Sequence, residues 1–184
     1  MRKKVLVPIA DGVEEIEAVC IIDVLRRAGA EVTVAAVGEL AVTASRGVRL
    51  MADRPLESCR GERFDLIALP GGLPGAEHLR DCGLLTDLLR QQARQNRLYA
   101  AICAAPAVVL QHHGLLAGRQ ATCHPALADR LDPVARPGAR VVVDGNCITS
   151  QGPGTALEFA LELVAQLFGP ERAEAVAGPM LARR

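Results

Sequence analysis

The chain has 184 residues, half of them hydrophobic, and this length and composition favour one globular domain with a sizeable core. Its formal net charge is zero, which argues against non-specific nucleic-acid binding, because such binding requires a basic surface. Aromatic residues make up only 2% of the chain, so a platform for stacking bases is not expected either. We therefore expect a single domain over residues 1–184.

The amino-terminal apolar run is too short for a signal peptide, and acidic residues follow it directly. The longest apolar stretch, from Leu98 to Leu110, is too short to span a bilayer and contains Pro106. We therefore expect a soluble, cytoplasmic protein with no membrane partner. The six cysteines are scattered without a C-x-x-C pair, so neither a disulfide framework nor a metal site is expected.

Strand and helix patterns alternate along the chain. In the first half of the chain we predict a strand over Val5–Ile9, a helix over Glu14–Ala28, a strand over Glu31–Val37, a hairpin of Leu40–Thr43 with Val48–Met51, a strand over Asp65–Leu69 and a helix over Ala76–Asn96 that is broken near Gly83. We then predict a strand over Leu98–Ile102, a helix over Ala104–His113, a short strand over Ala121–Cys123 and a loop over Asp129–Gly138. The last elements are two strands around a turn, Arg140–Val143 and Cys147–Ser150, and two helices, Gly154–Phe168 and Glu171–Leu181. This alternation predicts an α/β fold, a doubly wound, mostly parallel sheet with helices on both faces. Ligands bind such folds beyond the carboxyl ends of the strands.

Cys103 directly follows the strand predicted over Leu98–Ile102. Small residues flank it, as a nucleophile elbow requires where the chain turns sharply from strand to helix. A thiol at a helix N-terminus is expected to have a lowered pKa and to be a reactive thiolate. The alternative is an ordinary buried cysteine at a strand end.

A glycine-rich turn, Pro70-Gly71-Gly72, follows the strand predicted over Asp65–Leu69. Glycines expose backbone N–H groups, so this turn is a candidate oxyanion site, although a tight turn alone also requires glycine.

Glu17 lies on a stripe of the first helix with Cys20, Ile21 and Val24, and burial there would raise the pKa of its carboxyl. A protonated Glu17 can donate a hydrogen bond to a thiolate or a carbonyl. Glu14 and Glu15 compete with Glu17 for this role, and periodicity does not separate the three.

His124 follows the short strand predicted over Ala121–Cys123 and is a candidate partner for a cysteine nucleophile, with Asp23 a candidate to orient its ring. The alternative is a loop histidine with a backbone partner. Arg46 is a loop cation that can meet a carboxylate or remain solvated. The segment Thr149–Thr155 can cradle an anion or serve as a rigid connection between strand and helix.

Five segments together resemble one family: Val13–Ala18, Asp23–Gly29, Leu69–Gly72, Ala100–Pro106 and Thr149–Thr155. In this order they are similar to the ThiJ/PfpI superfamily, in the branch of the Parkinsonism-associated protein deglycase and its bacterial YajL-type relatives. The resemblance covers essentially the whole chain. It implies a flavodoxin-like fold, a homodimer and no cofactor.

The resemblance also implies residue roles. It makes Cys103 the reactive cysteine, Glu17 the acid that hydrogen-bonds it, and the N–H groups of Gly72 and Ala104, with Gly71 beside them, the oxyanion donors. His124 matches a histidine beside the cysteine, Asp23 its neighbour, and Arg46 a retained substrate-binding cation. Gln151 departs from the animal members, which carry arginine there, so an arginine-dependent anion site is not implied at that position.

The function implied is a cofactor-free enzyme acting on glyoxal or methylglyoxal adducts, as a deglycase-type hydrolase or a glutathione-independent glyoxalase, with a protective role in oxidative stress. Its partners would be small reactive carbonyls or glycated groups. The alternative is a redox-sensing chaperone whose Cys103 oxidises to sulfinate without significant turnover. A class I amidotransferase-like enzyme also uses an elbow cysteine, but it needs a late His and Glu pair, and no histidine follows His124.

Overall fold

The computed structural model describes residues 2–131 and 138–182 of the chain. A seven-stranded sheet runs in the order β5-β2-β1-β6-β7-β9-β8, and every neighbouring pair is parallel except β8 with β9. These strands are β1 (Lys4–Ile9), β2 (Glu31–Ala36), β5 (Arg54–Pro55), β6 (Leu66–Leu69), β7 (Leu98–Ile102), β8 (Val141–Asp144) and β9 (Cys147–Ser150). A separate antiparallel hairpin pairs β3 (Ala41–Thr43) with β4 (Arg49–Met51).

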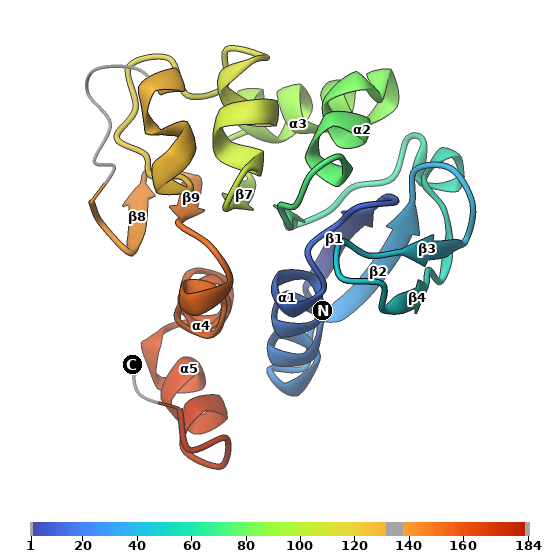
Figure 1. Cartoon of the computed structure of the whole chain (residues 1–184). Coiled ribbons are helices and arrows are strands. Elements are labelled where there is room, and N and C mark those ends of the chain that lie inside the picture. The colour runs from blue at the N-terminus through green and yellow to red at the C-terminus, as the bar shows by residue number, and fades with distance from the viewer. Residues whose placement is uncertain (1, 132–137, 183–184) are drawn as a thin grey trace.

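Helices cover both faces of the sheet (Figure 1). On one face α1 (Glu15–Arg27) packs against α4 (Ala156–Phe168), which in turn packs against α5 (Pro170–Ala177). On the other face lie α2 (Gly75–Asp81), α3 (Gly83–Arg94) and a π-helix over Pro106–Gln111, while 3-10 helices cover Leu56–Cys59, Pro125–Arg130 and Pro153–Thr155. The predicted doubly wound fold with helices on both faces is thus confirmed.

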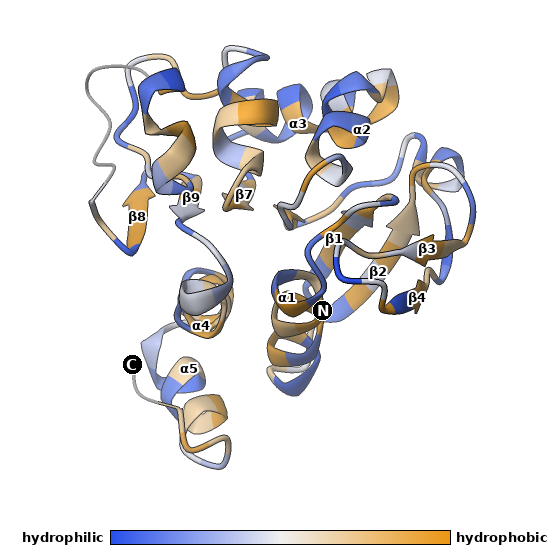
Figure 2. Cartoon of the chain, in the orientation of Figure 1, coloured by the Kyte–Doolittle hydropathy of each residue, from blue (hydrophilic) through white to orange (hydrophobic). Residues whose placement is uncertain are grey.

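The core forms where continuous apolar strands meet the apolar sides of the helices. Val5, Leu6 and Val7 in β1 are fully buried, as expected for a central strand covered on both faces. Helix α1 carries both hydrophobic and hydrophilic residues and buries Ile21 and Leu25 (Figure 2). Burial of such side chains contributes about 1.5–3 kcal/mol each.

The topology places a ligand site at one defined point of the sheet. Strand β1 lies between β2 and β6, so the chain extends the sheet to one side after β1 and to the other side from β6 onward. Such a switch point opens a crevice beyond the carboxyl ends of the two strands. The turn after β6 contains Gly71 and Gly72, and Cys103 directly follows the next strand in the sheet, β7.

Several predicted elements differ in detail from the structure. The predicted strand Ala121–Cys123 is wrong: it pairs with no strand, and the Thr122 N–H bonds instead to the Thr149 side chain at 2.9 Å. The helix predicted over Ala104–His113 is a six-residue π-helix. The last helix ends at Ala177 rather than Leu181, and most of the predicted loop Asp129–Gly138 lies outside the described residues.

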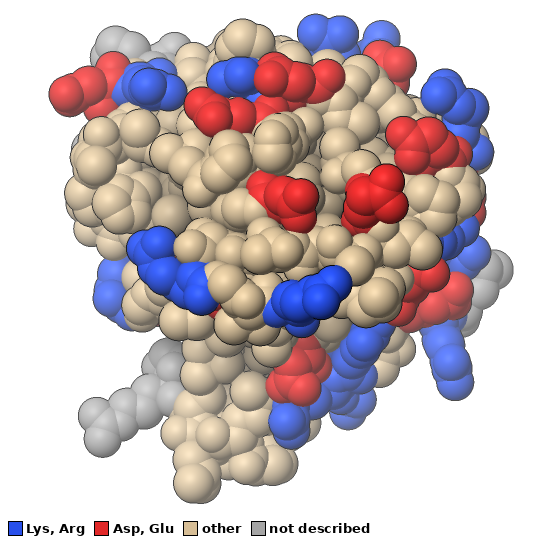
Figure 3. Space-filling model, turned by 45° about the vertical axis from the view of Figure 1, so that its right-hand side comes forward, with Lys and Arg blue, Asp and Glu red and all other residues tan. Residues whose placement is uncertain are grey.

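Charges are mixed on the molecular surface. On the face shown in Figure 3, acidic and basic side chains are interspersed rather than gathered into a patch of one sign. Within the described residues, no helix is both long and apolar enough to cross a bilayer.

Candidate functional site

Cys103 occupies a strained turn between β7 and the π-helix. Its φ of +65° lies in the left-handed region, which non-glycine residues rarely adopt and which is often found at functional sites. Neighbouring segments hold this conformation from both sides. The Cys103 N–H donates to the Ser150 carbonyl at 3.0 Å, and the His124 N–H donates to the Cys103 carbonyl at 2.8 Å. The predicted elbow geometry is therefore present.

The glycine turn after β6 packs directly on this elbow. A Cβ at Gly71 would lie 2.7 Å from the Cys103 Cβ and 2.8 Å from the Ile102 carbonyl oxygen, so only glycine fits. Gly72 has a φ of +89°, and a Cβ there would lie 2.4 Å from the Glu14 nitrogen. The turn is thus built for close backbone approach, and the N–H groups of Gly72 and Ala104 both hydrogen-bond the Cys103 sulfur.

The three acids that begin α1 have three different roles. Glu14 caps the helix, because its Oε2 accepts the Glu17 N–H at 2.9 Å. Glu15 turns away from Cys103 and accepts hydrogen bonds from Ser45 and Arg46. Only Glu17 reaches the elbow, and it is fully buried. Geometry thus resolves a choice that helical periodicity left open.

Glu17 links the glycine turn to the thiol. Its Oε2 accepts the Gly71 N–H at 2.8 Å, and its carboxyl lies within reach of the Cys103 side chain. In the described part of the chain, Oε1 is buried and meets no partner at regular hydrogen-bond geometry. The carboxyl group therefore has one oxygen fixed by the main chain and the other available for proton exchange with sulfur.

Burial raises the pKa of Glu17 from 4.5 to about 7. The hydrogen bonds from Gly71 and Cys103 act in the opposite direction, and the charge of Glu14 adds to the increase. A carboxyl group with this pKa exchanges protons readily near neutral pH, as a general acid–base group should.

The thiol does not behave as the helix-dipole argument predicts. Burial, the charge of Glu17 and the hydrogen bond to it raise the pKa of Cys103 to about 12, and they outweigh the N–H groups of Gly72 and Ala104, which lower it. The expected lowered pKa is therefore wrong for a thiol beside an ionised Glu17. The following helix is a short π turn, whereas the carboxylate is in direct contact.

Glu17 and Cys103 consequently act as a pair that shares one proton. The arrangement with a thiol and a carboxylate has the same net charge as the one with a thiolate and a carboxylic acid, and the two interconvert by transfer across one hydrogen bond. Protonation of Glu17 removes its charge, which is the second-largest cause of the raised pKa of Cys103. The buried carboxyl can thus receive the proton that the nucleophile must lose.

The elbow opens into a cleft of about 430 Å³. Most of the predicted site residues meet here, and the described lining residues are Glu14, Ser45, Arg46, Gly72, Leu73, Cys103, Ala104, His124, Ala126, Leu127 and Pro153. Cys103 is only 9% exposed, so the cleft admits small reagents rather than a bulky chain to the sulfur. Glu17 is fully buried and is not among the described lining residues.

A second hollow, of about 1000 Å³, lies at the amino ends of the strands. It is lined among others by Lys4 and Glu31, which begin β1 and β2. Although it is larger, its described lining contains no thiol or histidine, and ligand sites in this fold class lie at the other end of the strands. The smaller cleft is therefore the candidate active site.

His124 lies on the rim of the cleft, as a predicted partner of Cys103 should. Its Nδ1 accepts the Ala126 N–H at 3.2 Å, which leaves Nε2 as the protonated nitrogen in the neutral ring. Asp23 does not orient it within the chain. The Asp23 carboxylate instead accepts from Arg27 Nε at 2.6 Å, because the two lie one turn apart on the exposed side of α1.

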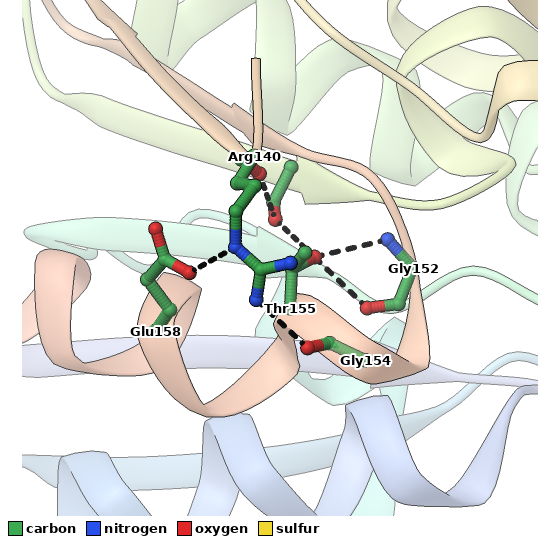
Figure 4. A network of polar contacts seen from close by, with 6 residues as sticks. Arg140, Gly152, Gly154, Thr155 and Glu158 are labelled. Carbon is green, nitrogen blue, oxygen red and sulfur yellow. Dashed lines mark hydrogen bonds and ion pairs between the residues drawn. The ribbon is translucent and has the colours of Figure 1, made fainter. Parts of the chain in front are cut away.

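The loop after β9 contributes Pro153 to the lining of the cleft, and Figure 4 shows the polar contacts that hold this loop. The Ser150 hydroxyl donates to the Arg140 carbonyl at 2.7 Å and lies 2.7 Å from Thr155 Oγ1, which also accepts the Gly152 N–H at 3.1 Å. Gly152 in turn lies against the His124 ring. The segment predicted either to cradle an anion or to connect rigidly thus has the hydrogen bonding of a rigid connection, and Gln151 lies within it.

Sequence reasoning missed several lining residues. Leu73, Leu127 and Pro153 give the cleft an apolar wall, but isolated apolar residues in loops carry no distinctive signal. Glu15 was seen only as a competitor of Glu17. Its partners Ser45 and Arg46 lie about 30 positions away along the chain, so no local periodicity can reveal these contacts.

Comparisons with known proteins agree with this geometry. Residues 3–166 match the model of the DJ-1/PfpI family. The protein dj-1beta of Drosophila melanogaster is 44% identical over 184 residues, which cover 98% of each chain. The Arabidopsis thaliana protein DJ-1 homologs B and A are 53% and 49% identical, but the chain spans only 39% and 44% of their lengths.

One relative carries an activity in its name. The glutathione-independent glyoxalase DJR-1.2 of Caenorhabditis elegans is 38% identical over 96% of this chain and 94% of its own. Among solved structures, oxidized DJ-1 of Toxoplasma gondii superposes with a TM-score of 0.97 at 49% identity, covering 99% of this chain and 100% of that one. The bacterial YajL-type branch stays a prediction. By sequence and structure, the chain belongs to the DJ-1/PfpI family.

Proposed function

We propose that this protein is a cysteine-dependent enzyme that acts on small reactive carbonyls, with Cys103 as nucleophile and Glu17 as proton carrier. The observation that carries this proposal is the buried Glu17 carboxyl in hydrogen-bond contact with a thiol at a strained elbow. The kinship with a glyoxalase that needs no glutathione supports the same chemistry. The further deglycase activity on glycated groups, a hydrolase reaction, rests on family resemblance alone.

The first step joins sulfur to the aldehyde carbon of methylglyoxal. The Cys103 proton passes to Glu17 as the C–S bond forms, and the carbonyl oxygen becomes an oxyanion. The N–H groups of Gly72 and Ala104 hydrogen-bond the sulfur and lie beside the place where this oxygen would develop its charge. The product of the step is a hemithioacetal after the oxyanion receives a proton.

The second step moves hydrogen between the two carbons. A base removes the C1 proton to give an enediol, and reprotonation at C2 gives a lactoyl thioester on Cys103. C1 is thereby oxidised and C2 reduced, so no external oxidant or cofactor is needed. Water then hydrolyses the thioester to lactate and restores the thiol. Glu17 serves as proton carrier, with His124 at the cleft rim as a second acid–base group.

Product analysis tests this proposal. The full chain is incubated with methylglyoxal in D₂O without glutathione, and lactate is detected by NMR. Lactate should form, with deuterium at C2 to the extent that the carried proton exchanges with solvent. The Cys103→Ser variant should form none above the uncatalysed background. Equal lactate formation by Cys103→Ser would refute the proposed nucleophile.

A redox role is the second candidate. The comparison with oxidized DJ-1 of Toxoplasma gondii favours it, as does a sulfur surrounded by N–H donors and a carboxyl that can hydrogen-bond sulfinate oxygens. As a redox-sensing chaperone, the protein would take up two oxygens from peroxide at Cys103 and show little turnover. Peptide mass spectrometry after mild peroxide, set beside steady-state lactate formation, separates the two roles.

Assembly and location are also proposals. Helix α1 and the β3–β4 hairpin expose large apolar side chains, namely Ile16, Val19, Val48 and Met51, as a homodimer interface would require. A cytoplasmic location fits a protein that uses free thiols, and the described cysteines are all unpaired.

A further inference from the structure

Glu15 is a buried acid whose carboxylate leaves its own helix. It is 7% exposed, and it reaches the turn between β3 and β4. The Ser45 hydroxyl donates to Oε2 at 3.0 Å, and the Arg46 N–H donates to Oε1 at 2.9 Å and to Oε2 at 3.2 Å. One carboxylate thus holds two successive residues of the turn.

Apart from Glu15, the turn is attached to the body of the domain on its β3 side, where the Gly12 N–H donates to the Thr43 carbonyl at 2.8 Å. Arg46, Gly47 and Val48 are exposed, and the nearest main-chain contact to the body of the domain is the Ser45 N–H to the Val13 carbonyl at 2.8 Å. Ser45 and Arg46 nevertheless line the cleft together with Cys103. The position of this part of the rim therefore depends on the contacts of Glu15.

Glu15 makes these contacts as an anion. Burial acts to raise the pKa of Glu15, but the hydrogen bonds from its own N–H, the Ser45 hydroxyl and the N–H groups of Arg46 and Val48 lower it below the usual value. In contrast to Glu17, Glu15 is therefore fully ionised at neutral pH and is committed to holding the turn.

Arg46 brings a positive charge to the rim. In the described part of the chain no carboxylate lies within ion-pair distance of its guanidinium, whose Nη1 lies 3.4 Å from the Ser45 carbonyl. A guanidinium without a carboxylate partner can bind the carboxylate of a ligand through paired N–H donors.

We infer that Glu15 is a positioning residue: by holding the Ser45 hydroxyl and the Arg46 main chain, it keeps the Arg46 guanidinium at the rim of the Cys103 cleft, where it favours ligands that carry a carboxylate. This inference rests on the proposed function only in taking Cys103 as the reacting atom. It adds a substrate class, small carbonyl compounds with an acidic group.

Two alkylating reagents of nearly equal size test the inference. Iodoacetate carries a carboxylate and iodoacetamide is neutral, and both alkylate thiols. Their rate constants at Cys103 are measured on the full chain by peptide mass spectrometry, which separates Cys103 from the other five cysteines. The ratio of the iodoacetate rate to the iodoacetamide rate reports the charge at the rim, independently of any enzymatic turnover.

The Glu15→Gln variant should lower this ratio by about three- to fivefold, the size expected for displacing one partly screened charge. Arg46→Gln should lower it equally, and the double variant should fall no further. Ser45→Ala, which removes one contact with Glu15 and serves if Glu15→Gln does not fold, should give a smaller decrease. The exposed Arg49→Gln, outside the cleft, is the matched control and should leave the ratio unchanged.

The sign of the effect separates positioning from simple charge. If Glu15 acted only by its own negative charge, its removal would raise the iodoacetate rate. A raised or unchanged ratio in Glu15→Gln, or a further decrease in the double variant, would overturn the inference. A purely structural defect would slow both reagents or lower the melting temperature without moving the ratio, and that result would overturn it as well.

Discussion

The fully buried carboxyl of Glu17 lies within reach of the Cys103 thiol, and its Oε2 is fixed by the Gly71 N–H at 2.8 Å. Helix α1, the glycine turn after β6 and the end of β7 thus meet at this pair of acidic groups. Because the two acidic groups repel each other when both are ionised, the pair keeps one proton over a wide pH range. This relationship sets the chemistry available to the cleft.

The pH dependence of turnover should report this pair. Burial raises the pKa of Glu17 to about 7, so the carboxylate form that accepts the thiol proton becomes more abundant as the pH rises through 7. The value of kcat/KM for methylglyoxal should therefore increase across this range and then level off.

Other titrating groups near the cleft need a control. His124 lines the cleft and is the other candidate acid–base group there. The His124→Asn variant should keep the rise near pH 7 if Glu17 is its source. Loss of that rise in His124→Asn, with retained activity, would assign it to the histidine instead.

The Gly71 position should tolerate no side chain. In Gly71→Ala the new Cβ would meet the Cys103 Cβ at 2.7 Å and the Ile102 carbonyl at 2.8 Å, so the elbow or the turn must shift. We expect a loss of about 1–3 kcal/mol in the free energy of unfolding and a fall of at least tenfold in turnover. Gly83→Ala, with nothing within 4 Å of its Cβ, is the control and should retain both. Chemical denaturation and lactate assays measure the two effects, and a fully active Gly71→Ala would contradict the packing.

The wall after β9 should depend on the Thr155 hydroxyl. The nearly isosteric Thr155→Val leaves the buried Gly152 N–H without its acceptor, at a cost of about 1–3 kcal/mol. Because Gly152 packs against the His124 ring, kcat should fall together with stability in this variant. Thr155→Ser keeps the hydroxyl and should restore most of both. Wild-type behaviour of Thr155→Val with a loss in Thr155→Ser would show that the methyl group matters rather than the hydrogen bond.

The sequence predicted the architecture well because long apolar runs dominate it. Strands such as Val5–Ile9 and Leu98–Ile102 are continuous and buried, so their type and nearly their bounds follow from pattern alone. The segment 121–123 was wrong, because a side-chain acceptor, Thr149 Oγ1, replaces a strand partner there. A short run of strand-forming residues does not reveal whether its N–H groups meet a carbonyl or a hydroxyl.

The sequence identified the residues that meet at the site but not the direction in which the pKa of the thiol shifts. Position after a strand identified Cys103 and the glycine turn, and family resemblance selected Glu17 among three acids. Burial is the largest cause of the raised pKa of the thiol, and a contact with a residue 86 positions away adds to it, so a local argument from the helix dipole gave the wrong direction. Within the chain Asp23 pairs with Arg27, one helical turn away, and its role beside His124 stays a prediction.

The most direct test of the account is turnover by a Glu17→Gln variant whose thiol remains accessible. Peptide-resolved labelling with iodoacetamide first shows that Cys103 is still in place, and Glu31→Gln, an exposed acid at the start of β2, is the matched control. The account predicts that kcat/KM for methylglyoxal falls by about 10²-fold in Glu17→Gln, the usual contribution of a general acid–base group, and is unchanged in Glu31→Gln. Wild-type turnover by a Glu17→Gln variant whose Cys103 is still labelled by iodoacetamide would contradict the account.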